Sequence, residues 1–424
     1  MPNSRRHSWK TEVAVVALAG MAVALSARAD DAPPSWQALG LSGTLRASAF
    51  SHDFSVDRHA SAAAVSTWFT AAPRQFLGAR AFLDGWLQAE SLRRGSRTSA
   101  DLREGYVERP LGDVDVKAGR QIIVWGRADK INPTDVWSVR DLTLLTTDNE
   151  DQRLGAVAVQ ANRRFGEVRL IGVWQPEWRT PQFPISQLPS GLTAHNLRPN
   201  DPSGQYGLKL DHSGAGVDWS VSYAHAIDKL PDLRLGTSTD LDFIYQPIQM
   251  YGADAAVPVG QYGLRAEMAY TRRPRRDDPA AFTKYSDLFL VAGIERTFGG
   301  EFNVNLQYLY RRNDGFQDPD HIADPVRRTL AQREEVLANQ LARHMSGVSV
   351  RIVDRLLNET LQAEISGVAW QGRGGGTVGA KLSYAVNDRL QFVVGSQVYF
   401  GPTSGFFGAL ERSSNGYAEA RWSF

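Results

Sequence analysis

The chain has 424 residues, and its 47 Lys and Arg residues nearly balance its 46 Asp and Glu residues, giving a formal net charge of +1. This balance offers no electrostatic argument for nucleic-acid binding. Cysteine is absent, which excludes disulfides, thiolate metal sites and haem attachment through cysteine. We therefore expect no cofactor, no metal and no nucleic-acid partner.

The first 29 residues have the layout of a secretory signal peptide. A basic start is followed by an apolar stretch from Val13 to Leu25 and then by Ala27-Arg28-Ala29 before Asp30. This order matches a signal with an A-x-A cleavage site, and the apolar stretch is shorter than the roughly 20 residues of a membrane-spanning helix. We expect cleavage of residues 1–29, a short periplasmic segment at 30–39, and one domain over 40–424.

Long segments with alternating apolar and polar residues follow along the chain. The clearest lie at 217–223, 261–271, 301–312 and 389–400. Strands of about ten residues can cross a tilted bilayer, whereas strands of soluble sandwiches usually have about five or six. The pattern predicts an all-β fold, a transmembrane antiparallel β-barrel with one face toward lipid.

Short turns and long connections also alternate. Short turns such as 164–167 and 386–389 separate long connections such as 127–153, 176–204 and 313–346. This is the pattern of membrane barrels with short periplasmic turns and long extracellular loops. If residues 40–50 form the first strand and the alanine-rich 59–70 the second, the tally is about 18 strands, with about 16 as the alternative.

The chain ends on a strand-like alternation of Ala418, Ala420, Trp422 and Phe424. A terminal aromatic in this position resembles the closing strand of bacterial outer-membrane barrels, in which it is the sorting and assembly signal. The resemblance implies that Trp422 and Phe424 are read by the barrel assembly machinery. It also implies location in the outer membrane of a Gram-negative bacterium, with lipid and lipopolysaccharide as partners.

The most distinctive run is Gly119–Asp135, which reads GRQIIVWGRADKINPTD. It resembles a family of Gram-negative outer-membrane proteins of largely unassigned function that carry G-R-Q, W-G and N-P-x-D in this order. The close match covers this run alone. The resemblance implies a porin-like barrel and does not indicate a particular substrate.

Residues 127–153 are expected to join the fifth and sixth strands. In general porins the corresponding connection folds inward and narrows the pore. By that analogy, opposed charges would create a transverse field that selects small polar solutes; the constriction candidates are Arg127, Asp129, Lys130, Asp135, Arg140 and Asp141. The alternative is that these charges pair and pin the connection to the wall, and the two interpretations are compatible.

Strand alternation places further charges on the inward face of the barrel. These candidate lumen-wall residues are Lys209, Asp211, Arg265, Glu267, Arg311, Glu419 and Arg421. Their signs are mixed, so they do not indicate a strong ion selector. The simplest interpretation is a solvated wall.

Two features of the long connections are also informative. Asp324 before Pro325 predicts a helix start, and Val326, Leu330, Leu337 and Leu341 follow at helical spacing. The apolar stripe would pack on neighbouring loops, or the helix would drop into the pore mouth as a gate.

The arginines of the run 272–276 would be solvated and internally paired, or would contact lipopolysaccharide phosphates.

The sequence thus predicts a porin-like channel for passive diffusion of small polar solutes. The alternative is a barrel plugged by its loops that acts as a scaffold or as part of an export or surface assembly. An enzyme is not expected, because Gly-x-Ser-x-Gly and His-Glu-x-x-His runs are absent and no catalytic residue can be assigned. A homo-oligomer remains compatible with the sequence.

Overall fold

The computed structural model describes residues 40–53, 61–73, 79–92, 95–184, 193–197, 199, 204–236, 240–274 and 281–424. The expected signal peptide and the expected periplasmic segment at 30–39 lie outside these ranges.

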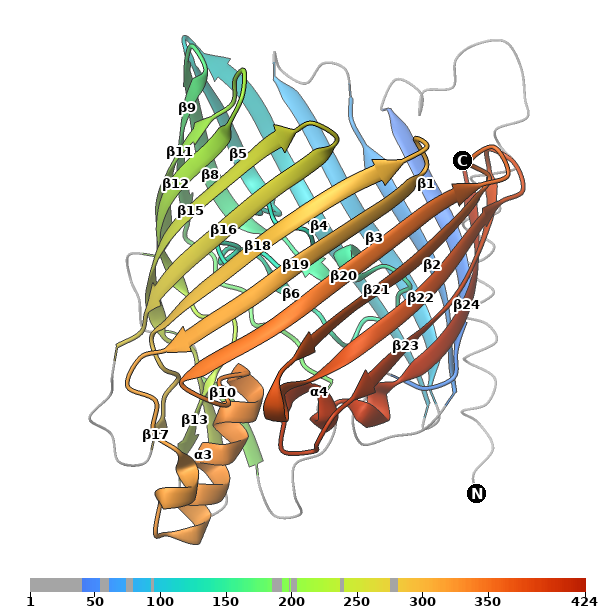
Figure 1. Ribbon diagram of the computed structural model, residues 1–424. Helices are drawn as coiled ribbons and strands as arrows, with labels where there is room; N and C mark the ends of the chain where they lie inside the picture. The colour runs from blue at the N-terminus through green and yellow to red at the C-terminus, as the bar shows by residue number, and fades with distance from the viewer. Residues whose placement is uncertain are drawn as a thin grey trace, which may run out of the picture.

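Eighteen antiparallel strands form one closed barrel (Figure 1). Each strand pairs with the next in chain order, and the last strand pairs with the first through contacts such as Arg46 opposite Arg421. The strands are β1 (Leu41–Phe50), β2 (Ala62–Ala71), β3 (Arg80–Leu92), β4 (Gly95–Leu111), β5 (Val114–Gln121), β8 (Ala156–Phe165), β9 (Val168–Gln175), β11 (Gln205–His212), β12 (Asp218–Ile227), β15 (Pro247–Val259), β16 (Tyr262–Arg272), β18 (Asp287–Phe298), β19 (Phe302–Asn313), β20 (His344–Leu356), β21 (Leu361–Trp370), β22 (Gly375–Ala385), β23 (Leu390–Phe400) and β24 (Asn415–Ser423). The predicted count of 18 is confirmed, and the alternative of 16 is wrong.

The outer surface of the barrel is apolar. On β19, Leu306 and Tyr308 are 49% and 47% exposed, whereas Asn305 and Gln307 between them are buried at 5% and 2%. Exposed apolar side chains recur in the same phase on most of the other barrel strands. An apolar belt of this kind is stable only against lipid, so the predicted division into a lipid face and an inward face is confirmed.

Short turns lie at one end of the barrel and long connections at the other (Figure 1). The C-terminus lies at the short-turn end. Tight turns there use glycine where the backbone is left-handed, as at Gly112 with φ of 62°. Two connections at the opposite end are also short, between β3 and β4 and between β21 and β22, so the expected alternation of lengths holds only in part.

Smaller elements lie in the connections between barrel strands. They are β6 (Val139–Arg140), β7 (Arg153–Leu154), β10 (Thr193–Leu197), β13 (Asp232–Leu235), β14 (Asp240–Ile244), β17 (Ala281–Phe282), α3 (Pro325–Ala338), α4 (Phe406–Ala409) and the 3-10 turns η2 (Asn149–Gln152), η3 (Pro319–His321), η4 (Gly372–Gly374) and η5 (Glu411–Ser413). Of these, β6, β7 and η2 belong to the β5–β8 connection. Strands β10, β14, β13 and β17 form a small separate sheet. No helix among the described residues is long and apolar enough to cross a membrane.

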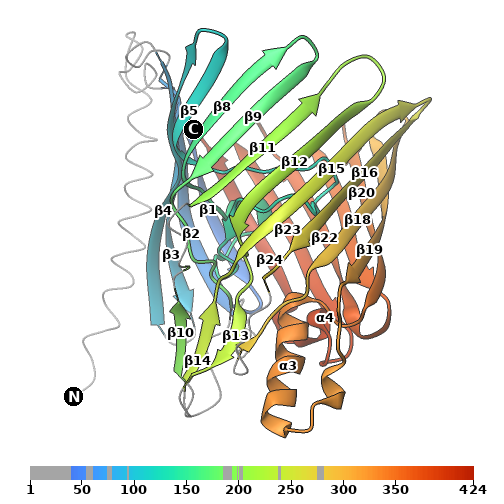
Figure 2. The same ribbon diagram turned by 90° about the vertical axis from the view of Figure 1, so that its left-hand side faces the viewer.

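Helix α3 begins where the sequence predicts. The Asp324 carboxylate accepts hydrogen bonds from the backbone N–H groups of Val326 and Arg327, each at 2.9 Å. The predicted apolar stripe holds only in part: Leu341, just after the helix, is buried in a hydrophobic cluster. Val326 is 59% exposed, and the buried residues of the helix itself are Glu334, Glu335 and Ala338. The helix projects from the barrel rim in both views, so it is not a gate lying inside the pore mouth (Figures 1 and 2).

Candidate functional site

The β5–β8 connection, residues 122–155, lies inside the barrel and joins the fifth and sixth barrel strands, as expected. Its trace runs through the interior in both views (Figures 1 and 2). Its side chains and backbone contact inward-facing residues of β1, β3, β11, β15, β16, β20, β21, β22 and β24. The connection is therefore attached to the wall around most of its circumference.

One buried carboxylate organises the start of the connection. Glu267 on β16 is 1% exposed and accepts hydrogen bonds from the N–H groups of Arg127, Ala128 and Thr134 at 2.9, 3.0 and 2.9 Å. It also accepts from the Thr134 hydroxyl at 2.8 Å. Gly126 has φ of 107°, and a Cβ there would lie 2.5 Å from a Glu267 oxygen, so only glycine fits. The glycine and the Asn-Pro-Thr turn of the distinctive run thus both lie against the Glu267 carboxylate, which accepts the hydrogen bonds of this segment.

Aromatic packing fixes the same segment. The rings of Trp125 and Trp137 meet edge to face with centroids 5.0 Å apart. They pack with inward-facing apolar residues of β8, β9, β12, β15 and β16, among them Ala158, Ala224 and Met250. The expectation of a solvated inward face is wrong for this sector of the barrel, which is a dry core shared by wall and connection.

Arg127 binds two acids of the wall. Its guanidinium pairs with Asp254 on β15 at 2.5 Å and with Asp211 on β11. Arg169 pairs with Asp211 at 2.8 Å, and Lys209 lies 3.8 Å from Asp254. Asp211 and Asp254 are almost fully buried, so losing Arg127 would leave desolvated negative charge in the wall.

The next charged pair of the connection reaches a different sector of the wall. Lys130 pairs with Glu364 on β21 at 2.5 Å. Arg351 on β20 pairs with the same glutamate at 3.2 Å and lies 3.8 Å from Asp129. The candidates Asp129 and Lys130 therefore hold the connection against β20 and β21.

The remaining constriction candidates make most of their contacts within the connection itself. Asp135 pairs with Arg153 at 2.7 Å, and Arg140 pairs with Glu150 at 2.9 Å. The Asp141 carboxylate accepts from the N–H of Thr143 at 2.9 Å and closes a local turn. The structure thus brings the six candidates into one connection inside the barrel, where three bind the wall and three bind mainly within the connection.

The far end of the connection binds the closing strands. The Thr147 hydroxyl donates to Glu419 at 3.0 Å and accepts from Arg421 at 2.7 Å. Asp151 pairs with Arg46 on β1 at 2.6 Å, and Asp148 lies 3.7 Å from Lys381 on β22. Leu144 packs with tryptophans of β2 and β3.

The predicted lumen-wall residues face inward, but they are not simply solvated. Lys209, Asp211, Glu267, Glu419 and Arg421 all contact the inward-folded connection or its partners, as described above. Arg265 pairs with Glu295 on β18 at 2.9 Å and is the more open of the set. Arg311 lies 3.3 Å from Asp287 and donates to the carbonyl of Asn339 at 3.1 Å, near the long-loop end.

Several site residues were not expected from the sequence. They are Arg46, Asp151, Asp254, Arg351, Glu364 and Lys381. Asp151 lies in the turn η2 of the connection. The others have one available signal, a charge on the inward phase of an alternating strand, as for Asp254 between Ala253 and Ala255. That signal marks an inward charge but does not reveal its partner.

The last strand closes the barrel. The Phe424 N–H donates to the Gly43 carbonyl at 3.0 Å, and the Gly43 N–H returns a bond at 3.1 Å. Trp422 and Phe424 lie on the strand phase opposite Glu419 and Arg421, with ring centroids 5.8 Å apart. Within the described ranges, no group of three or more His, Asp and Glu residues is arranged to hold a metal ion.

A closed 18-stranded antiparallel barrel with an apolar belt is the fold of bacterial outer-membrane β-barrels. The chain belongs to the family described as "Protein of unknown function (DUF1302)", whose model matches residues 35–418. Membership of a family without an assigned function is thus confirmed, whereas the role of the Gly119–Asp135 run as its signature stays a prediction. The sequence matches no curated protein.

Solved structures of similar fold span nearly the whole chain. OccAB2 of Acinetobacter baumannii has a TM-score of 0.53 at 10% identity, covering 91% of this chain and 97% of that one. OccK11 (OpdR) of Pseudomonas aeruginosa has a TM-score of 0.51 at 12% identity, covering 91% and 95%. OpdK of the same bacterium, solved with vanillate, has a TM-score of 0.52 at 10% identity, covering 91% and 97%. At these identities the likeness concerns the fold.

Proposed function

We propose that the protein is a porin-like channel of the outer membrane of a Gram-negative bacterium. Small polar solutes cross it by passive diffusion, and residues 127–153 narrow the passage. The observation that carries the proposal is the β5–β8 connection, which lies inside a closed barrel and binds inward-facing charges on β11, β15 and β16, on β20 and β21, and on β24 and β1.

The apolar belt supports insertion into lipid, since an exposed surface of this kind is not stable in water. Trp422 and Phe424, at the end of the closing strand, serve in this proposal as the signal for the assembly machinery. Residues 1–29 direct export and are removed. Lipid and lipopolysaccharide are the expected surroundings, and the protein acts without cofactor and without catalysis.

Two features support passage of small solutes in particular. A barrel of similar fold, OpdK, has been solved with vanillate, which is a small organic acid. Here the connection also presents both signs of charge: Asp129 and Lys130 lie beside β20 and β21, while Arg127 lies beside β11 and β15. Opposed charges of this kind favour small dipolar solutes and resist apolar ones.

The second candidate is a barrel sealed by its own loops that acts as a scaffold. The packing of Trp125 and Trp137 against five strands favours this alternative, because a dry core fills one sector of the interior. A scaffold requires no conduction, so one measurement separates the two functions.

The test is single-channel conductance of the folded mature protein in a planar bilayer, beside a variant that lacks residues 129–148. Folding of both is checked first by the heat-dependent shift in gel mobility that intact barrels show. The channel proposal expects stable conductance that rises on deletion. Well-folded protein that conducts in neither form would overturn it and favour the scaffold. Equal conductance of both forms would keep a channel but move the constriction elsewhere.

A further inference from the structure

A cavity of about 1010 Å³ lies at the long-loop end of the barrel, outside the inward-folded connection. Its walls come from α3, the β16–β18 connection and the residues before α3. This volume is at the upper limit of the range of about 300–1,000 Å³ that is usual for ligand pockets. The channel proposed above does not require such a cavity.

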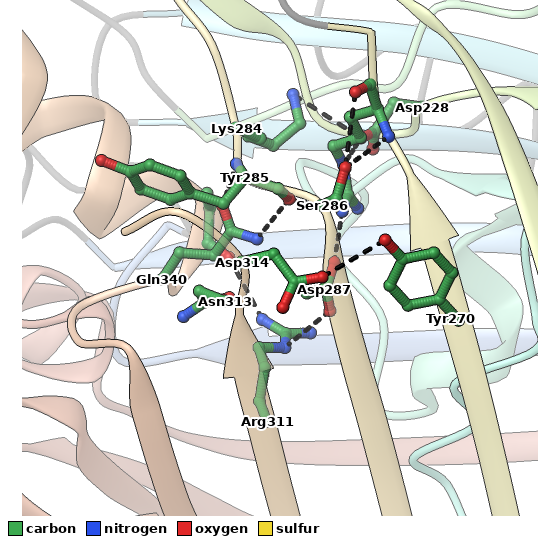
Figure 3. A network of polar contacts seen from close by, with 12 residues as sticks. Asp228, Tyr270, Lys284, Tyr285, Ser286, Asp287, Arg311, Asn313, Asp314 and Gln340 are labelled. Atoms are coloured by element: carbon green, nitrogen blue, oxygen red, sulfur yellow. Dashed lines mark hydrogen bonds and ion pairs between the residues drawn. The ribbon is translucent and has the colours of Figure 1, made fainter. Parts of the chain in front are cut away.

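Arg273 and Lys284 in the cavity lining belong to an ionic network, which we call the floor; Figure 3 shows part of this network. Arg273 pairs with Asp228 at 2.7 Å and with Asp287, and Lys284 pairs with Asp232 at 2.7 Å. Lys284 and Arg273 overcome the effect of burial and lower the pKa of Asp228 to about 2. Together with Arg311, three bases thus balance three acids, so the floor offers no net charge to a ligand.

The side of α3 that faces the cavity is unusual because it buries two glutamates. Arg327, Ala331, Glu334, Glu335 and Ala338 line the cavity at helical spacing. Glu334 and Glu335 are each 4% exposed, although a buried helix face is normally apolar. A buried carboxyl group is costly unless its oxygens are bonded, so stability alone does not explain this face.

Both glutamates keep unused bonding capacity. One Glu334 oxygen accepts from the N–H of Leu233 at 2.9 Å, and one Glu335 oxygen lies 3.4 Å from the guanidinium of Arg373. The second oxygen of each has no partner in the described part of the chain. Burial raises the pKa of both groups, that of Glu335 to about 7 despite Arg373. Near neutral pH the Glu335 carboxyl group is therefore partly protonated and can both donate and accept, and burial favours the protonated form of Glu334 in the same way.

The other lining residues add donors and flat surfaces. Arg272 and Arg327 are exposed in the lining, and Tyr270 and Tyr285 contribute aromatic rings. Outside the floor network and the two glutamates, the lining carries two acids, Asp314 and Asp318, and two bases, Arg272 and Arg327. A site with balanced charge, donors, acceptors and aromatic rings suits a ligand whose groups both donate and accept and which carries no net charge.

We propose that this cavity binds a neutral, hydroxyl-rich solute, a short oligosaccharide, with Glu334 and Glu335 accepting its hydroxyl donors. The cavity would hold the solute at the outer mouth of the barrel. Binding there goes beyond the proposed channel, and it can be measured whether or not the barrel conducts.

The test is isothermal titration calorimetry of the folded mature protein in a detergent without a sugar head group. The probe is maltotriose, with spermidine and citrate as charged comparators. We expect maltotriose to bind more tightly than either. Glu334→Leu and Glu335→Leu should weaken its binding about tenfold or more, because each removes both carboxyl oxygens from a desolvated site.

Two further variants test the proposal independently if a glutamate variant misfolds. Ala331→Trp should weaken binding by narrowing the cavity beside Glu334 and Glu335, and Arg272→Ala, at an exposed position, should weaken it without unfolding the barrel. Arg333→Ala, exposed on the same helix but outside the lining, is the matched control and should leave binding unchanged. No binding of maltotriose to folded protein, binding that Ala331→Trp leaves intact, or tighter binding of spermidine or citrate would each overturn the proposal.

Discussion

Gly126 and Glu267 lie so close that a Cβ on the glycine would stand 2.5 Å from a carboxylate oxygen of the glutamate. The two residues are far apart in the chain, and their contact closes the inward-folded connection onto β16. Around it, the N–H groups of Arg127, Ala128 and Thr134 all donate to the same carboxylate. One side chain thus holds both ends of the turn that carries the first constriction candidates.

We predict that Glu267→Ala releases this turn. The substitution leaves buried N–H donors unbonded, at about 1–3 kcal/mol each, so the start of the connection should become mobile inside the barrel. The expected readout is larger mean conductance with greater open-channel noise in a planar bilayer. The matched control is Arg265→Ala, which faces inward two positions earlier on β16 and pairs with Glu295 rather than with the connection. Equal effects of the two variants would contradict the role of Glu267 as an anchor.

Arg127 should influence ion selectivity as well as folding. In Arg127→Ala, Arg169 and Lys209 are the cationic partners that Asp211 and Asp254 keep among the described residues, so the wall gains uncompensated negative charge. We expect the reversal potential in a potassium chloride gradient to shift toward cation selectivity. The double variant Arg127→Ala/Asp254→Asn should shift the potential back toward the wild-type value. A shift that persists unchanged in the double variant would show that the charge does not come from this cluster.

The barrel was predictable because each strand has one face toward lipid and the other toward the interior. Alternation such as Asn305, Leu306, Gln307, Tyr308 records lipid on one side and the interior on the other, and neighbouring strands are also neighbours in sequence. The start of α3 was predictable for a similar reason, since Asp324 and Pro325 act on the adjacent turn.

The partners of the connection were not predictable. Glu267 lies 133 positions from Thr134 and 140 from Arg127 in the chain, and no local pattern links them. The alternation also predicts a water-facing inward phase, whereas Ala224 and Met250 pack against Trp125 and Trp137. Alternation shows that a residue faces inward but not what fills the interior there.

The lipid face gives a further prediction. Tyr308→Arg should reduce insertion into lipid vesicles, because an arginine near the bilayer midplane costs about 2–4 kcal/mol. Asn303→Arg, on the inward phase of the same strand, should fold with nearly normal yield. The measurement is the fraction of protein with the heat-dependent mobility of a folded barrel. Similar losses for both variants would contradict the assigned phase of β19.

The last prediction concerns pH and the α3 wall. Burial raises the folded-state pKa of Glu335 to about 7 from an ordinary value of 4.5, with partial opposition from Arg373. The stabilising contribution of its protonated carboxyl is therefore fully present below about pH 4.5 and is lost as the pH rises through about 7. We expect α3 to be held less firmly at pH 8 than at pH 5.

A nitroxide label on Val326→Cys would report this change, because Val326 is 59% exposed and the chain has no other cysteine. The electron paramagnetic resonance spectrum should show greater label mobility at pH 8 than at pH 5, with a midpoint near 7. Glu335→Gln cannot ionise, so it should remove the transition, and the exposed Arg333→Gln on the same helix should leave it in place. A transition that survives in Glu335→Gln would assign the pH dependence to another group, and the absence of any transition in the labelled parent would show that ionised Glu335 does not loosen the helix.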